Sequence, residues 1–219
     1  MRICLVILLL GGSCLAPAQS SDRSAAASKS AHKTYTSPNR SFQFTYPALL
    51  IRCEKHLQQP GYLANWTPEE CAAYSPTCDM SLDVGKKDTL VCVAYPRNEH
   101  TDTPAFEAGT FSVAVVDAAT TASACLPPAP EQNGKTMGPR TIHGIQFTEY
   151  EASDAGMSHG VDARIYRALH GGTCYELAIA VASQNPKVFD PPEREQSSKD
   201  IVAVNAALEQ TRDSFRFLK

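Results

Sequence analysis

Aromatic and polar residues alternate in the segment that opens the structured part of the chain. In residues 41–47 (SFQFTYP), Phe42, Phe44 and Tyr46 occupy every second position, which places them on one buried face of a strand that Pro47 ends. The runs at 89–95 and 109–116 are mostly apolar and β-branched, so we expect strands that are covered on both faces. Two further strands are predicted at 49–53 and 145–150.

A β-hairpin is predicted where two strand-like runs flank Gly171-Gly172, because both turn positions can take positive φ without steric cost. A two-residue turn fixes the register of the two strands. We expect Arg167 and Glu176 to form an exposed cross-strand pair worth about 0.2–1 kcal/mol. The predicted register places His170 opposite Thr173, Leu169 opposite Cys174, Arg167 opposite Glu176, Ile165 opposite Ala178, and Arg164 opposite Ile179.

Two helices and two loops complete the predicted elements. The capping box formed by residues 67–70 (TPEE) predicts a short helix that continues to about Tyr74. Ser197 or Ser198 caps a longer helix that runs to about Arg212 and ends in an extended segment at 214–218. Residues 118–140, rich in Pro and Gly, and residues 152–159 are predicted to be loops. The longer helix carries one apolar stripe that needs a sheet to cover it: Ile201, Val204, Leu208, Thr211 and Phe215.

The N-terminus has the pattern of a secretory signal. Arg2 precedes an apolar run at 3–10, and Ala16-Pro17-Ala18 is a small-residue cleavage site. The apolar run is too short to span a bilayer, so residues 1–18 are expected to be removed before Gln19, which leaves a secreted or periplasmic protein. A rival cleavage remains open, because residues 10–14 (LGGSC) loosely match a lipobox in which Cys14 would carry a lipid anchor in the cell envelope.

The mature chain is expected to hold one domain after a short spacer. Residues 19–34 are rich in Ser and Ala and lack large apolar side chains, so we expect them to be disordered. Residues 35–219 have the length of a single globular domain. Ser30-x-x-Lys33 has the form of a serine–lysine nucleophile pair, but a spacer offers no packed scaffold to hold its geometry.

An even number of cysteines remains after signal cleavage, which would remove Cys4 and Cys14. An even set in an exported chain predicts disulfides, here three of them. Zinc ligation is disfavoured because the nearest spacing is Cys71-x₆-Cys78 rather than a close C-x₂-C pair. The six cysteines are Cys53, Cys71, Cys78, Cys92, Cys125 and Cys174, and the pairing we favour is Cys71–Cys78, Cys53–Cys92 and Cys125–Cys174.

Composition removes several classes of partner. The formal net charge is −3 and the chain carries no basic run, so nothing in it favours binding to nucleic acid. A hydrophobic content of 43% together with 15 prolines is typical of a globular protein with many loops. After signal cleavage, no stretch approaches the ~18 apolar residues of a transmembrane helix.

Candidate chemistry is sparse. The sequence contains no G-x-S-x-G, no H-E-x-x-H, no phosphate-binding glycine loop and no calcium loop, so we predict no catalytic, cofactor-binding or metal-binding residue. His159 and His170 are interpreted as exposed loop and turn histidines. Tyr62, Trp66 and Tyr74 are interpreted as a small satellite core beside the cysteines, with a recognition surface as the alternative.

Two segments at opposite ends of the domain resemble the PsbP-like superfamily: FQFTYP at 42–47, and the closing amphipathic helix that ends in Asp213-Ser214-Phe215. That superfamily contains photosystem II extrinsic subunits and a nuclear Ran-binding protein. The resemblance implies an α+β fold, an antiparallel sheet between helices in an α/β/α sandwich. It also implies a non-enzymatic binding or accessory role, but it brings no functional residue with it.

A second resemblance concerns residues 164–167 (RIYR), 172–177 (GTCYEL) and the C-terminal SFRFLK, which look like a group of secreted bacterial proteins. The six cysteines depart from PsbP itself. Two functions therefore remain open. The first is an exported binding or accessory domain for a protein or envelope ligand, with the sheet edge and the two long loops as contact surfaces. The alternative is a small envelope hydrolase that uses a histidine and a carboxylate from residues 152–170.

Overall fold

The computed structural model describes residues 31–56, 65–82, 87–97, 105–127, 134–156, 158–192 and 197–219. The predicted signal segment, Cys4, Cys14, Ser30 and Tyr62 lie outside the described residues. Within them, the first strand begins at His32, so the last three residues of the predicted disordered spacer belong to a strand. The spacer prediction is wrong for these three residues because Lys33 and Thr34 pair with Tyr46 and Thr45.

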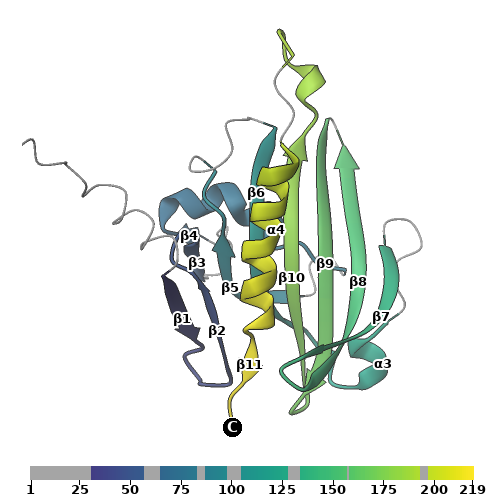
Figure 1. Ribbon diagram of the computed structural model, residues 1–219. Coiled ribbons are helices and arrows are strands. Elements are labelled where there is room, and N and C mark those ends of the chain that lie inside the picture. The colour runs from purple at the N-terminus through teal and green to yellow at the C-terminus, as the bar shows by residue number, and fades with distance from the viewer. Residues whose placement is uncertain are drawn as a thin grey trace, which may run out of the picture.

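Two antiparallel sheets form the framework of the described chain (Figure 1). The small sheet has the order β1-β2-β11, with bounds His32–Thr36, Phe42–Pro47 and Arg216–Phe217. The large sheet has eight strands in the order β4-β3-β5-β6-β10-β9-β8-β7. Their bounds are Ile51–His56 for β3, Asn65–Thr67 for β4, Lys87–Ala94 for β5, Phe106–Val116 for β6, Gly134–Ile142 for β7, Ile145–Gly156 for β8, His159–His170 for β9 and Thr173–Gln184 for β10.

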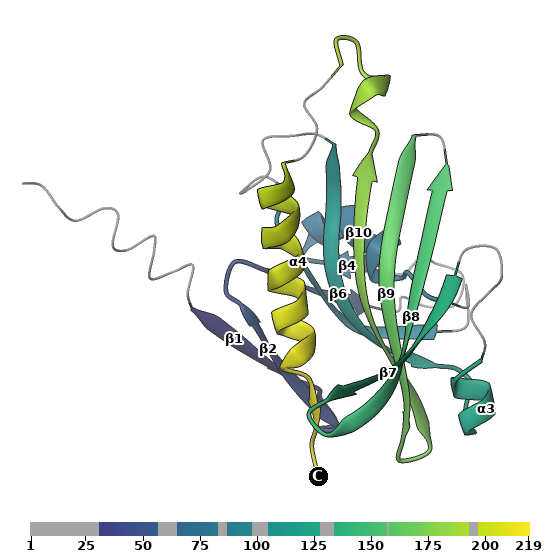
Figure 2. The same cartoon turned by 45° about the vertical axis from the view of Figure 1, so that its right-hand side comes forward.

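Helices lie on both faces of the large sheet, which confirms the predicted α+β architecture. Helix α4 (Ser198–Asp213) crosses one face over β6 and β10 and leaves β7 to β9 beside it (Figures 1 and 2). The opposite face is covered by the 3₁₀ helix η1 (Glu69–Tyr74) and by α2 (Ser75–Cys78), with α3 (Ala122–Cys125) against β9. A short 3₁₀ turn, η2 (Pro186–Val188), follows β10.

The predicted alternation in β2 is confirmed. Its buried side chains, Phe42, Phe44 and Tyr46, lie on the same face of the large sheet as α4. Phe44 contacts Phe111 edge to face with ring centroids 5.3 Å apart, and the ring centroids of Phe42 and Phe215 are 5.5 Å apart. These rings belong to the largest hydrophobic cluster of the described chain. The small sheet and the C-terminal segment therefore close the core on this side.

Helix α4 begins where the sequence predicts. The Ser197 hydroxyl accepts a hydrogen bond from the Asp200 amide and so caps the helix. Val204, Leu208, Thr211 and Phe215 are buried, whereas Ile201, the first residue of the predicted stripe, is 41% exposed. The helix thus covers the sheet with its later turns and leaves an apolar side chain uncovered in its first turn.

The predicted hairpin register is confirmed at every pair from His170–Thr173 to Arg164–Ile179. Gly171 and Gly172 take φ values of 57° and 77°, as the two-residue turn requires. The expected exposure of the Arg167–Glu176 pair is wrong: both side chains are fully buried. Helices and chain segments cover this face of the central strands, so the pair lies inside the protein.

Both predicted loops contain long strands. Within 118–140 the structure has α3 and most of β7, and the expected loop at 152–159 contains the end of β8, up to Gly156, and the start of β9 at His159. Ala152 and Ser153 pair with Ala163 and Asp162 of β9. Strand pairing in the folded chain overrides the weak β-propensity of this Ala-, Ser- and Asp-rich segment.

Three disulfides are present, but two of the predicted pairings are wrong. Cys125–Cys174 is as predicted, while the other bonds are Cys53–Cys71 and Cys78–Cys92. Cys53 and Cys92 are direct cross-strand neighbours, and each bonds to a cysteine of the helical segment that covers them. The two bonds therefore fix the segment from η1 to α2 on the sheet, instead of linking the strands to each other.

The short helix also starts differently from the prediction. It is a 3₁₀ helix whose N-cap is Pro68, and no side chain caps it, so the predicted capping box does not form. Tyr74 at its end is buried among the four cysteines and its hydroxyl accepts a hydrogen bond from the Arg97 amide. For Tyr74, the satellite-core interpretation is confirmed, whereas the side chain of Trp66 lies outside the description.

Candidate functional site

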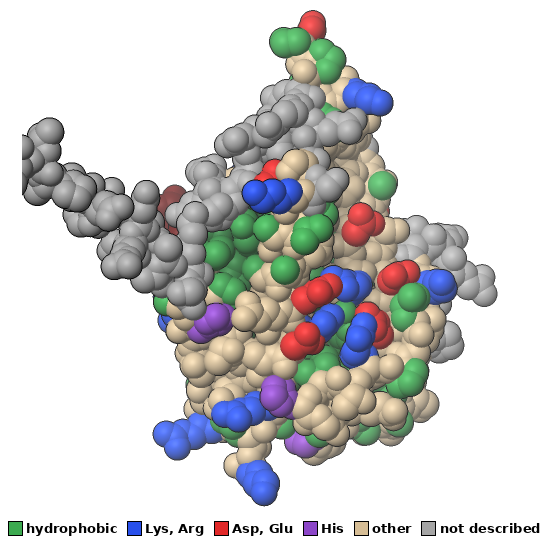
Figure 3. All heavy atoms as spheres, in the orientation of Figure 1, with side chains coloured by type: hydrophobic (Ala, Val, Ile, Leu, Met, Phe, Trp, Pro, Cys, Tyr) green, Lys and Arg blue, Asp and Glu red, His purple; other side chains and the backbone are tan. Residues whose placement is uncertain are grey.

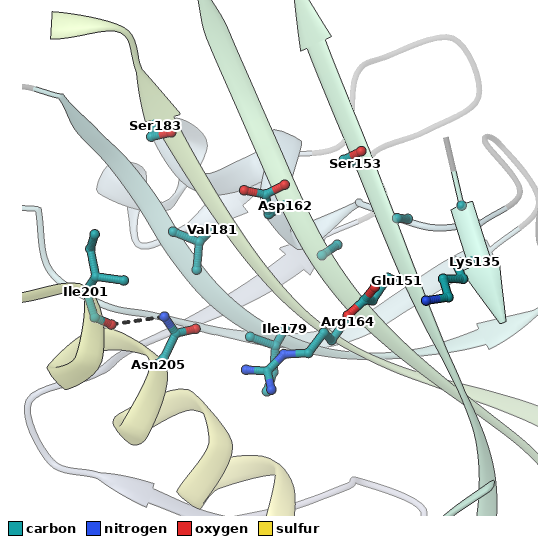
Figure 4. Close-up of a pocket in the computed structure, with 13 residues that line it drawn as sticks. Lys135, Glu151, Ser153, Asp162, Arg164, Ile179, Val181, Ser183, Ile201 and Asn205 are labelled. Carbon is teal, nitrogen blue, oxygen red and sulfur yellow. Dashed lines mark hydrogen bonds between the residues drawn. The ribbon is translucent and has the colours of Figure 1, made fainter. Parts of the chain in front are cut away.

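A groove of about 650 Å³ opens between the first turns of α4 and the strands β7 to β10 (Figure 4). Ile201 and Asn205 form the helix side of this groove, and residues of four neighbouring strands form its floor and far wall. The Asn205 side chain is held by a hydrogen bond to the Ile201 carbonyl, at 3.0 Å. We call this feature the α4 groove.

The strand register arranges the floor of the α4 groove in two rows of side chains. The first row runs Lys135–Glu151–Arg164–Ile179 across β7, β8, β9 and β10. The second row runs Ser153–Asp162–Val181 across β8, β9 and β10. Cross-strand partners share a face of the sheet, so every side chain of both rows faces the groove. Both rows are apolar next to the helix and polar away from it.

The apolar side of the groove consists of Ile179, Val181 and Ile201. Ile179 is buried, Val181 is half-buried, and Ile201 is exposed above them on the helix. Helix α4 approaches β6 closely at this level: a Cβ atom built on Gly109, the β6 partner of Val181, would lie 2.7 Å from Val204 Cγ1. The position of the helix is thus set by close packing, which leaves the groove as a formed feature of the fold.

The polar side holds charges of both signs, which Figure 3 shows intermixed beside the helix. Arg164 extends toward α4 (Figure 4). Its Nη2 lies 2.5 Å from Glu209 Oε1 of that helix. Glu151 stands between Lys135 and Arg164 as the cross-strand partner of both. Asp162 lies between Ser153 and Val181, and within the described residues its carboxylate has no ion pair or hydrogen bond.

A hydrogen-bond network closes the lower end of this face. The Tyr166 hydroxyl donates to Glu149 Oε1 at 3.1 Å and accepts from Arg212 Nη1 at 2.7 Å. Arg140 Nε donates to the second oxygen of Glu149 at 3.0 Å. Burial raises the pKa of the Tyr166 hydroxyl above its usual value. These groups are occupied with one another and hold the end of α4 against β9.

A different ionic cluster lies on the opposite face of the sheet. Arg167 Nε and Nη2 both lie 2.7 Å from Glu176 Oε2, and Lys87 Nζ lies 3.4 Å from Glu176 Oε1. The Ser81 hydroxyl donates to Glu176 at 3.1 Å, and Lys87 Nζ donates to the Met80 carbonyl at 2.5 Å. Burial lowers the pKa of the Lys87 ammonium, and the charge of Glu176 opposes that shift. This cluster is closed to solvent and holds the chain after α2 on the sheet.

The two histidines of the predicted hydrolase site lie apart. His159 Nδ1 is 2.7 Å from Glu107 Oε1, so its carboxylate partner comes from β6 and not from residues 152–170. His159 lies at a shallow, open depression, and its Nε2 is 3.5 Å from the amide nitrogen of Gln184. His170 stacks on Phe217 with ring centroids 3.9 Å apart. The structure does not bring the two rings to one site.

Sequence reasoning missed the α4 groove. Lys135 fell in a predicted loop, and Ser153 was assigned to another, so the rows that they complete were not foreseen. The available signal was the alternation of residues 149–153 (EYEAS), which carries the strand predicted at 145–150 on to Ser153. Extending that strand would have placed Glu149, Glu151 and Ser153 on one face.

Two further findings describe the whole of the described chain. In that part, no group of three or more His, Cys, Asp or Glu side chains could hold a metal ion. No helix found there is long and apolar enough to cross a membrane.

The sequence matches no family model and no curated protein. Similar solved structures include a crystal structure from Bacteroides thetaiotaomicron, which has 10% sequence identity to this chain and a TM-score of 0.41. The match covers 85% of this chain and 48% of that chain. The chain thus spans about half the length of that protein. The solution structure of cyanobacterial PsbP (CyanoP) from Synechocystis sp. is 9% identical with a TM-score of 0.39, covering 94% of this chain and 98% of that chain.

A third similar structure is that of LpqN, a protein involved in cell envelope biogenesis of Mycobacterium tuberculosis, with 9% identity and a TM-score of 0.32. The match covers 62% of this chain and 80% of that chain.

Proposed function

We propose that this chain is an exported, non-enzymatic binding domain and that its ligand is a small molecule held in the α4 groove. The observation that carries the proposal is the uncovered apolar side of the groove: Ile201 is 41% exposed and, together with Val181, lines a cavity of about 650 Å³. Ligand sites in proteins are concave, apolar and largely formed in advance, with a few polar groups that orient the ligand. The α4 groove shares the concave shape and has an apolar side, and it is more polar than most such sites because Lys135, Glu151, Asp162 and Arg164 also line it.

A groove-filling substitution tests the proposal. Ile201→Trp places an indole in the groove, and Val202→Trp places the same group on the neighbouring helix position, which is 66% exposed and does not line the groove. A library of small-molecule fragments is screened against the native protein by ligand-observed NMR. We expect the hits to bind Val202→Trp as they bind the native chain and to lose binding to Ile201→Trp. Fragments that bind all three proteins equally would refute the groove as the site.

The alternative function is a small envelope hydrolase, and one contact favours it: the 2.7 Å approach of His159 to Glu107, which is the pairing that orients a catalytic histidine. A general base also needs a nucleophile at its second nitrogen. The neighbour of Nε2 is the Gln184 amide, which is no nucleophile. Turnover of ester or amide substrates that disappears in His159→Gln would establish the alternative, and we expect no such turnover.

Export is the second half of the proposal. Three disulfides support it, because such bonds persist in oxidising compartments and are rare in the cytosol. Mass spectrometry of the mature N-terminus distinguishes the two cleavages: a chain that begins at Gln19 is secreted or periplasmic, and a chain that begins at an acylated Cys14 is anchored in the envelope. A full-length chain with its leader intact and its thiols reduced would contradict export.

A further inference from the structure

The charged residues of the α4 groove differ in whether an opposite charge lies beside them. Arg164 is engaged by Glu209 at 2.5 Å, and Lys135 stands beside Glu151 on the neighbouring strand. Both cations of the groove therefore have an acid of the chain next to them. Asp162 is different, since its cross-strand neighbours are Ser153 and Val181, and no described cation forms an ion pair with its carboxylate. Asp162 is thus the acid of the groove that has no cation beside it on a neighbouring strand.

Asp162 also stands at the boundary between the polar and apolar parts of the groove. On one side it adjoins Val181, the apolar floor next to the helix, and on the other side it adjoins the Ser153 hydroxyl (Figure 4). Ser183 lines the same part of the groove. A carboxylate with two hydroxyls nearby offers acceptors to a donor-rich group, while the apolar floor begins one strand away.

We propose that the α4 groove selects an organic cation: a ligand with an ammonium group that binds Asp162 and an apolar body that lies against Val181, Ile179 and Ile201. An ammonium group donates three hydrogen bonds and accepts none, which matches the Asp162 carboxylate and the hydroxyls of Ser153 and Ser183. Hydrogen bonds in which one partner is ionised are stronger than hydrogen bonds between neutral groups. A carboxylate ligand would meet Asp162 as a like charge, while the cations of the groove, Arg164 and Lys135, lie beside Glu209 and Glu151.

This inference rests on the proposed function and adds the chemical class of the ligand. It is tested with three probes that share one tail: hexylamine, hexanol and hexanoate. Each is titrated into the ¹⁵N-labelled native protein, and binding is followed through the amide signals of the groove. We expect hexylamine to bind most tightly, hexanol weakly and hexanoate least, with shifts centred on Asp162 and Val181.

Two variants locate the charge that matters. Asp162→Asn keeps the shape of the side chain and removes its charge, and we expect it to weaken hexylamine binding about five- to tenfold while leaving hexanol binding unchanged. Asp154→Asn is the matched control, because it makes the same change at an exposed carboxylate of β8 that does not line the groove. We expect it to change hexylamine binding less than about twofold.

The outcomes separate the inference from the proposed function. Hexylamine and hexanol binding equally in the groove would overturn the selection of cations while groove binding stands. Preference for hexanoate, or loss of hexylamine binding in Asp154→Asn but not in Asp162→Asn, would also overturn it. Hexylamine shifts confined to the surface outside the groove would overturn the inference and weigh against the proposed site as well.

Discussion

Arg164 and Arg167 lie three residues apart on β9 and face opposite sides of the same sheet. Arg167 is fully buried against Glu176 and Lys87, whereas Arg164 lies in the α4 groove, 29% exposed, and pairs with Glu209 on the helix. Both arginines thus have an acidic partner within 2.7 Å. They differ in their access to water, and this difference decides what each pair contributes.

A buried ion pair costs several kcal/mol to break, because the remaining charge stays in a medium that solvates it poorly. A pair in contact with water contributes little to stability, since water solvates either partner once the other is gone. The comparison therefore separates the two faces by role. The charges beneath η1 and α2 maintain the fold, and those of the α4 groove stay in contact with water, where the proposed ligand would bind.

The largest effect is expected from Glu176→Gln. This substitution leaves Arg167 and Lys87 buried without a counter-charge, and we expect the free energy of unfolding to fall by about 3–5 kcal/mol. Glu151→Gln removes an exposed carboxylate from the other face and should change it by less than about 0.5 kcal/mol. Urea denaturation measures both. Equal losses in the two variants would erase the distinction between the faces.

Removal of the Cys78–Cys92 bond comes next. This disulfide closes a loop of 14 residues and holds the segment that covers Lys87, so Cys78→Ser with Cys92→Ser should lower the free energy of unfolding by about 3 kcal/mol in the chain-entropy model. Groove ligands should still bind under conditions in which the variant is folded. Loss of their binding in a variant that remains folded would show that the two faces are coupled.

A substitution on the groove face, Gly109→Ala, should cost about 1–3 kcal/mol. The added methyl group would lie 2.7 Å from Val204 Cγ1, so α4 has to move away from β6. Gly160→Ala on β9 is the matched control, because its nearest neighbour is the Asp154 carbonyl at 4.0 Å. Urea midpoints that are the same for both variants would contradict the close packing of α4 on which the shape of the groove depends.

The smallest effect concerns pH. Burial lowers the pKa of Lys87 below its ordinary value of 10.5, so between the lowered pKa and pH 10.5 the unfolded chain binds more protons than the folded one. The free energy of unfolding of the native chain should therefore rise relative to that of Lys87→Met as the pH increases toward 10.5, by at most about 1.4 kcal/mol per pH unit. The buried tyrosines, whose pKa values are raised, lower the free energy of unfolding of both chains above pH 10, so their contribution drops out of the difference. A constant or narrowing difference would contradict the assigned burial of Lys87.

Local signals in the sequence predict much of the fold. The aromatic alternation of β2, the Gly171-Gly172 turn and the Ser197 cap each depend on neighbours along the chain, and each is confirmed. The turn is sufficient to pair Arg167 with Glu176 correctly. It cannot indicate their burial, because the residues that cover them belong to a segment about ninety positions earlier, which includes Ser81, at a sequence separation of 95.

The same limit explains the errors. Cys53 and Cys92 are neighbours in the sheet, as the favoured pairing required, but the position of the η1–α2 segment above them gives each a different partner. The α4 groove likewise depends on Lys135, Ser153, Asp162 and Ile201, which four elements bring together. No short stretch of the sequence contains that arrangement, so residue spacing alone does not predict the site.

The most direct test of the account is a crystal structure of the protein with the tightest fragment from the binding screen. The account predicts electron density for the fragment between α4 and β9, in contact with Val181 and Ile201 and with its polar end at Asp162. Density in the open depression beside His159, with the α4 groove free of the fragment, would contradict it.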